Sequence, residues 1–184
     1  MLTIAIDKRQ IAELNKAIEG TSKKLQTELK ISVRAATKKT QSLMVKEITK
    51  RVKVTQKYVK RLTYVRVRAT GNFPQGEVVL RKSQRMPLKA FKGTRATRKG
   101  VSYQIDKQSG RKNIPSAFDV PTLGGHFFKR MSRRRMPIVA LHGPSPWGVF
   151  KVNNLELPTE KEAMKALHDQ IAKRIKYLKF KRNQ

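Results

Sequence analysis

The chain has 184 residues, among them 43 Lys or Arg against 12 Asp or Glu, and its formal net charge is +31. Such an excess of positive charge, with only 38% hydrophobic residues, argues against a self-sufficient compact sphere and indicates a polyanion or an acidic assembly as partner. The absence of cysteine excludes disulfides and thiolate sites, and no stretch approaches the roughly 20 apolar residues of a membrane span, so we expect a protein without a membrane anchor.

The amino-terminal part predicts a short strand followed by helices. Alternating apolar residues favour a strand at 2–6, and Asp7 is a suitable N-cap for a helix that ends at Gly20. Ser22 or its neighbour can cap a second helix of about 30 residues with apolar steps of three and four. Thr55 can cap a short third helix.

Positive charge begins with the long helix. Residues 21–70 contain 15 basic and two acidic residues, whereas residues 1–20 contain three of each. The basic side chains lie on the faces that the apolar stripe leaves free, which predicts a one-sided charged surface.

Strands are predicted in the middle of the chain and a helix at its end. Alternation at 64–68 and 77–81 around a turn at 71–76 predicts a hairpin, and further strands are expected at 100–105, 127–129 and 138–141. Pro158 opens a last helix, whose apolar stripe is Ala163, Leu167, Ile171 and Ile175.

These elements predict an α+β fold with long basic helices first, one small antiparallel β-sheet in the middle and a carboxy-terminal helix. We expect an N-terminal helical region at 1–63, a β-rich region at 64–150, and a last helix with a basic tail at 151–184. The segment 82–99 has many basic residues, no acidic ones and few apolar ones. We expect it to be a mobile loop until a partner docks on it.

Residues that could support catalysis are missing. The three histidines are far apart in sequence, the acidic residues of the middle are single, and the Gly143 to Trp147 segment lacks the second glycine of a nucleophile elbow, so we interpret it as a rigid Pro-rich turn. We therefore predict a protein that is not an enzyme, with no catalytic, cofactor-binding or metal-ligating residues.

Two patterns bear on nucleic-acid binding. The apolar spacing of residues 45–62 resembles a helix-turn-helix, which would expose Gln56, Lys57, Lys60 and Arg61, but a helix, a break and a short packing helix explain it more simply. The 12 aromatic residues are not interleaved with basic ones, so contacts to phosphates are favoured over contacts to bases. The candidate DNA-contacting residues are Lys30, Arg34, Lys38, Arg95, Arg98, Lys99, Lys129, Arg130, Arg133, Arg134 and Arg135.

Four segments of the second half carry a family resemblance. They are a Gly-Val strand at 100–105, an Ile-Pro-x-Ala-Phe segment within 110–118, an aromatic-x-Arg strand at 127–130 and a Pro-Ile to Gly-Pro-Ser segment at 136–145. In order and spacing they resemble the minor tail protein Z family of tailed phages. The resemblance also takes in the basic helical half at roughly residues 25–70, with weaker signatures. The chain departs from that pattern at residues 146–148, where a small aliphatic residue is expected before the next proline.

The resemblance implies a tail-completion or neck protein of the virion, without catalysis, which assembles in the host cytoplasm. Its implied partners are tail terminator or tail tube proteins, head-tail connector proteins, other copies in a ring of about six, and phage duplex DNA bound non-specifically. Candidate protein-interface residues are Phe118, Pro144 and Trp147. From charge alone, a ribosomal or nucleoid protein of the cytosol remains the alternative.

Overall fold

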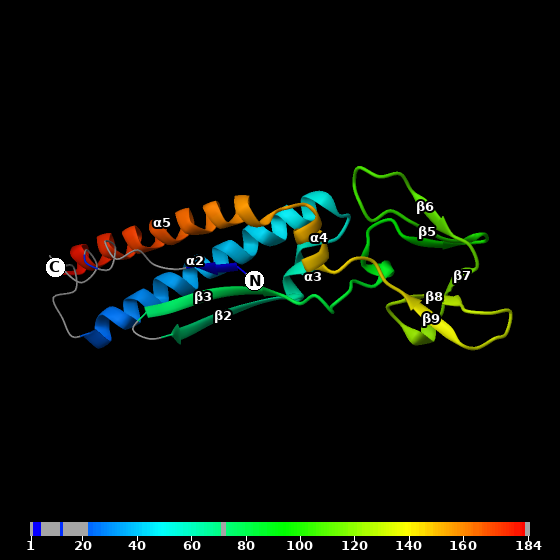
Figure 1. Ribbon diagram of the computed structural model, residues 1–184, viewed down its shortest axis with the longest axis horizontal. Helices are drawn as coiled ribbons and strands as arrows, with labels where there is room; N and C mark the ends of the chain where they lie inside the picture. The colour runs from blue at the N-terminus through cyan, green and yellow to red at the C-terminus, as the bar shows by residue number, and fades with distance from the viewer. Residues whose placement is uncertain (1, 5–11, 13–21, 71–72, 183–184) are drawn as a thin grey trace. The chain divides into compact units, whose positions relative to one another are not determined.

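The computed structural model describes residues 2–4, 12, 22–70 and 73–182. Within them the fold is α+β, as predicted, with a long helix α2 (Ser22–Arg51), three small antiparallel sheets and a long carboxy-terminal helix α5 (Glu156–Arg182) (Figure 1). The helix predicted at 7–20 lies outside the described residues, apart from Ala12, which is helical. The prediction of a single sheet was wrong because three separate groups of strands pair only among themselves.

The chain forms two compact units from interleaved segments. The first unit takes its residues from 1–44, 63–80 and 155–184, and the second takes them from 45–62 and 81–154. The regions expected at 1–63, 64–150 and 151–184 are consecutive in sequence. Each compact unit instead combines segments from more than one of these regions.

In the first unit, one sheet has the order β1 (Leu2–Ile4), β3 (Phe73–Leu80) and β2 (Thr63–Thr70). Strands β2 and β3 form the predicted hairpin, but residues 73–76 belong to β3 and not to the turn. Glycine at 76 allows close packing on α2, since a Cβ there would lie 1.9 Å from the Thr37 Oγ1 atom. Helix α2 therefore lies directly against β3.

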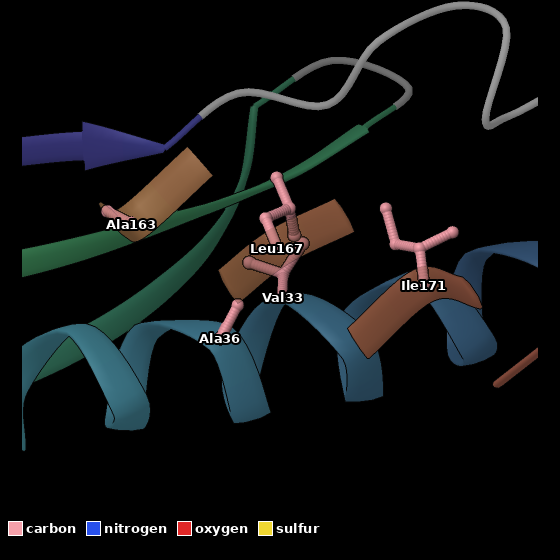
Figure 2. Packing of buried hydrophobic residues seen from close by; sticks show 5 residues of the cluster. All are labelled: Val33, Ala36, Ala163, Leu167 and Ile171. Carbon is pink, nitrogen blue, oxygen red and sulfur yellow. The ribbon is translucent and has the colours of Figure 1, made fainter. Parts of the chain in front are cut away.

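Helices α2 and α5 pack through small and branched apolar residues. Figure 2 shows Val33 and Ala36 on α2 beside Leu167 and Ile171 of α5. These side chains are fully buried, as is Ala163, and the apolar stripe predicted for the last helix is confirmed at these positions of α5.

Polar contacts fix the neighbours of α2. The Gln41 side-chain amide donates to the carbonyl and the hydroxyl oxygen of Thr63 at the start of β2, at 3.2 and 2.8 Å. The Glu28 carboxylate accepts two hydrogen bonds from the Arg174 guanidinium of α5. The hydrogen bond to Glu28 raises the pKa of Arg174 above its ordinary value, so this ion pair persists throughout the neutral range.

The second unit begins with residues 45–51 of α2 and helix α3 (Gln56–Arg61). Thr55 caps α3 as predicted: its hydroxyl oxygen accepts the Tyr58 backbone N–H. Val59 is buried on the inner side of this helix, and burial raises the pKa of Tyr58. The prediction of a short capped helix is confirmed.

The basic segment 82–99, expected to be a mobile loop, has regular structure and buried residues of its own. It contains a 3-10 turn (Leu88–Ala90) and strand β4 (Arg95–Thr97), and it buries Met86, Leu88 and Phe91. Met86 donates its backbone N–H to the Pro144 carbonyl and accepts the N–H of Gly143. These apolar anchors have no regular spacing, so periodicity did not indicate them.

Two sheets complete the second unit. One has the order β4, β5 (Gly100–Tyr103) and β6 (Lys112–Ile114), and the other β7 (Ala117–Asp119), β8 (Phe127–Arg130) and β9 (Ile138–Leu141). The predicted strands correspond to β5, β8 and β9, whereas β4, β6 and β7 were not predicted. A second 3-10 turn covers Pro121–Leu123.

Helix α4 (Pro146–Val152) follows β9, where a Pro-rich turn was expected. The Ser145 hydroxyl oxygen accepts the Gly148 N–H, and Pro146 occupies the first helical position. Serine at the N-cap followed by proline is a standard helix start, so the interpretation as a turn was wrong.

Candidate nucleic-acid interface

The eleven predicted DNA-contacting residues are all exposed. Three of them, Lys30, Arg34 and Lys38, belong to the first unit, and the other eight belong to the second.

In the first unit the predicted residues follow one face of α2. Lys30, Arg34 and Lys38 are spaced four residues apart, so their side chains are neighbours along the helix, while Val33 and Ala36 face the core. The adjacent Lys39 forms an ion pair with Asp169 at 3.6 Å. The amphipathic pattern of α2 thus produces the one-sided basic surface that the sequence predicted.

The second unit has a large uncompensated positive charge. Residues 81–154 contain 17 basic and two acidic residues. Asp119 forms an ion pair with Lys89 at 2.9 Å, and Asp106 accepts the Gln108 N–H at 2.9 Å. Both carboxylates are therefore already engaged locally, and basic residues outnumber acidic ones in this segment by 17 to two.

A cavity of about 700 Å³ brings several of these residues together. Its lining includes Arg98 and Lys99 from the turn between β4 and β5, Arg130 from the end of β8, and Phe118 from β7. No Asp or Glu lines it. Residues 32 positions apart in sequence thus share one cationic cavity.

Hydrogen bonds from side chains to backbone carbonyls hold the β4–β5 turn beside this cavity. The Thr97 hydroxyl donates to the Gly100 carbonyl at 2.8 Å, and the Asn113 side-chain amide donates to the Lys99 carbonyl at 3.2 Å. Gly100 has φ of +127°, and Ser116 on the other wall has φ of +61°. Two turns in the left-handed region of φ therefore shape the cavity walls.

Arg130 is positioned by an aromatic ring. Its guanidinium carbon lies 4.8 Å from the centroid of the Phe118 ring, within the range of a cation–π contact. The Phe118 ring in turn lies 6.5 Å from that of Phe128, measured between centroids. The stacked guanidinium keeps its N–H edges available for an anion.

The cluster Arg133–Arg135 occupies the loop between β8 and β9 and does not line the cavity. The loop is closed by a hydrogen bond from the Met131 N–H to the Pro137 carbonyl, at 3.2 Å. Met131 and Met136 flank the three arginines and are 69% and 64% exposed. The loop therefore presents both charge and apolar surface.

The candidate interface residues have different surroundings. Phe118 is half-buried beneath Arg130, and Pro144 is half-buried with its carbonyl bonded to Met86. Trp147 lies in the first turn of α4, half-buried, with the Lys82 Nζ atom 5.3 Å from its ring centroid. Their role as an interface stays a prediction.

Two histidines that are distant in sequence meet in the second unit. The rings of His126 and His142 have centroids 5.1 Å apart, and the His142 Nδ1 atom lies 3.1 Å from the Ala140 carbonyl oxygen. Sequence spacing carried no sign of this pair. Among the described residues, no group of three His, Asp or Glu side chains is arranged to hold a metal ion.

The residues of the helix-turn-helix hypothesis are exposed on α3. Gln56, Lys57, Lys60 and Arg61 all face solvent, while Val59 is buried. The arrangement also fits the simpler interpretation of a break followed by a short packing helix.

Comparison with known proteins returned no family model, no curated protein and no solved structure that matches this chain. The resemblance to minor tail protein Z accordingly stays a prediction from the sequence. Among the described helices, none combines the length and apolar character that crossing a membrane requires.

Proposed function

We propose that this protein is a structural component of a phage virion, a tail-completion or neck protein that contacts duplex DNA non-specifically. The observation that carries the DNA contact is the charge of residues 81–154, where 17 basic residues face two acidic ones that are already engaged. Exposed cations that are not interleaved with base-stacking aromatic side chains favour phosphates as their target.

The tail role rests on the four segments with a family resemblance. In the structure these segments correspond to β5, the stretch through β6 and β7, β8, and β9 with the loop to α4, and all belong to the second unit. Motifs that fall in one folded unit support a common origin better than isolated short matches would. The proposed partners are tail terminator or tube proteins, connector proteins and further copies of this chain in a ring of about six.

The DNA contact is tested by binding of the full chain to two duplexes of unrelated sequence over a range of salt concentrations. We expect equal affinities for the two duplexes and a log–log salt dependence with a slope of about −0.9 per phosphate contact. A chain that ignores duplex DNA even at low salt would contradict the proposal. A strong preference for one duplex would instead favour the helix-turn-helix hypothesis.

The virion role is tested by imaging and mass spectrometry of particles made without this protein. We expect heads and tails to accumulate without joining into infectious particles. A defect in translation or in chromosome compaction would instead support the alternative of a ribosomal or nucleoid protein.

A further inference from the structure

We propose that the cavity between the β4–β5 turn and β7 is a phosphate-binding site that takes one phosphodiester group of a nucleic acid. This inference rests on the proposed DNA contact and deepens it by naming the residues that hold one phosphate. They are Arg98, Lys99 and Arg130, with Phe118 as the support of Arg130.

Like charges converge in this cavity. Three cationic side chains line one cavity of about 700 Å³, and no carboxylate lines it with them. Asp119, which follows Phe118 in the sequence, forms an ion pair with Lys89 at 2.9 Å. Like charges that share a cavity repel one another, and a bound anion relieves that repulsion.

Neighbouring residues position the β4–β5 turn and the Arg130 guanidinium. The Asn113 and Thr97 hydrogen bonds hold the turn that carries Arg98 and Lys99, and the Phe118 ring supports the Arg130 guanidinium from one face. A guanidinium held in this way offers paired N–H donors to two oxygens of a phosphate. The backbone of the turn and the Arg130 guanidinium are thus held before the anion arrives, which lowers the entropy cost of binding.

The volume of the cavity also supports the proposal. Pockets that hold small organic ligands measure roughly 300–1,000 Å³, and this cavity lies within that range. It has room for a phosphate together with the sugar attached to it. A nucleic acid supplies many such groups, in keeping with the excess of basic residues around the site.

The direct test is a titration of the full chain with inorganic phosphate, followed by the backbone amide signals in NMR. We expect saturable shifts at Gly100 and Ala117 that exceed those caused by chloride at equal ionic strength. The triple variant Arg98→Gln, Lys99→Gln, Arg130→Gln should lose these shifts. Phosphate shifts that do not saturate, or that persist in the triple variant, would overturn the proposal.

The second test counts phosphates through the salt dependence of duplex binding. If the three cations share one phosphate, the triple variant lowers the slope by about 0.9, whereas three separate contacts would lower it by about 2.7. The control variant Arg85→Gln, Lys92→Gln, Lys107→Gln removes the same charge from exposed residues of the second unit outside the cavity. A change of about 0.9 in the cavity variant, with a smaller one in the control, supports the site.

Other outcomes separate the two proposals. Equal slopes in the cavity and control variants, or a drop near 2.7, would overturn the phosphate site while leaving DNA binding intact. If the unchanged protein does not bind duplex DNA, the proposed function fails, and the phosphate titration still decides whether the cavity binds the anion. If the cavity variant no longer binds phosphatidylglycerol vesicles but still binds duplex DNA, the phosphate comes from lipid and the assignment to nucleic acid is wrong.

Discussion

Glycine is required at position 100 by both conformation and space. Its φ of +127° is disfavoured for residues with a side chain, and a Cβ there would lie 2.1 Å from the Ile114 carbonyl oxygen. Because the close atom belongs to the backbone of β6, the clash cannot be relieved by a side-chain rotation. We predict that Gly100→Ala lowers the free energy of unfolding by about 1–3 kcal/mol.

Urea denaturation of the full chain measures this change, and Gly110→Ala is the matched control. A Cβ at position 110 would meet no atom within 4 Å, and its φ lies outside the left-handed region. Gly110→Ala should therefore leave the unfolding midpoint nearly unchanged. Equal effects of the two substitutions would contradict the tight turn beside the cavity.

Single residues show why the cavity could not be predicted from the sequence. Arg98, Lys99 and Arg130 were selected one by one for their charge, and all three are exposed as expected. Their convergence depends on strand pairing between β7 and β8 and on the contacts of β7 with β4 and β5. Those contacts are nonlocal, and no spacing in the sequence encodes them.

The packing of α5 on α2 depends on a few fully buried side chains. Leu167 is 0% exposed and lies in the cluster with Val33 and Ile171, whereas Leu157, at the start of the same helix, is 71% exposed. We predict that Leu167→Ala lowers the free energy of unfolding by about 2–5 kcal/mol and that Leu157→Ala changes it by less than about 0.5 kcal/mol. Thermal and urea denaturation measure both, and similar losses for the two variants would exclude the α2–α5 core.

The two ion pairs between α2 and α5 should contribute unequally. Glu28 and Arg174 have side chains 16% and 28% exposed and form two hydrogen bonds, whereas Lys39 and Asp169 are about half exposed and 3.6 Å apart. We predict a coupling free energy of about 1 kcal/mol for the first pair and of about 0–0.5 kcal/mol for the second. Double-mutant cycles of alanine substitutions measure both couplings.

The pH dependence of the first pair follows from its pKa shift. The pKa of Arg174 is raised by its hydrogen bond to Glu28, so the stabilisation is fully present below the ordinary pKa of arginine and is lost only as pH rises beyond the raised value. The coupling should therefore be the same at pH 7 and pH 9. A coupling that disappears between these values would contradict the assigned pair.

Elements with a regular pattern were predictable, and elements that depend on distant anchors were not. The stripes of α2 and α5 and the capping threonine of α3 are local signals, so their bounds could be predicted closely. The segment 82–99 is anchored by Met86 and Phe91, whose partners include Gly143, and six strands lie between them in the sequence. Helix α4 did have a local signal, Ser145 before Pro146, and the other prolines and glycines around it obscured that signal.

At the scale of the whole molecule, the two compact units carry their positive charge in different ways. The first unit places its cations along α2 opposite a buried apolar face, and Asp169 of α5 forms an ion pair with one of them, Lys39. In the second unit, residues 81–154 have only two acidic residues, and 129–135 is the densest cationic stretch of that segment. The charge of +31 was predictable from the sequence, but its division between two interleaved units was not.

The loop between β8 and β9 provides the strongest test of function that leaves folding intact. Arg133, Arg134 and Arg135 are exposed, and no ion pair is found for them among the described residues. We predict that reversing all three to Glu weakens duplex binding and lowers the salt-dependence slope by about 2.7, because each consecutive arginine can meet its own phosphate. The unfolding midpoint should stay within about 2 °C, as is usual for exposed substitutions.

The control for this variant reverses Lys165, Lys173 and Lys176, three exposed residues of α5 that were not predicted to contact DNA. It applies the same change in net charge, so long-range attraction to DNA falls equally in both variants and only direct contacts separate them. The arginine variant should also reduce the yield of infectious particles, whereas the lysine variant should reduce it less. If the two variants bind DNA with equal slopes and give equal yields, then the β8–β9 loop is not a contact surface and net charge alone accounts for binding.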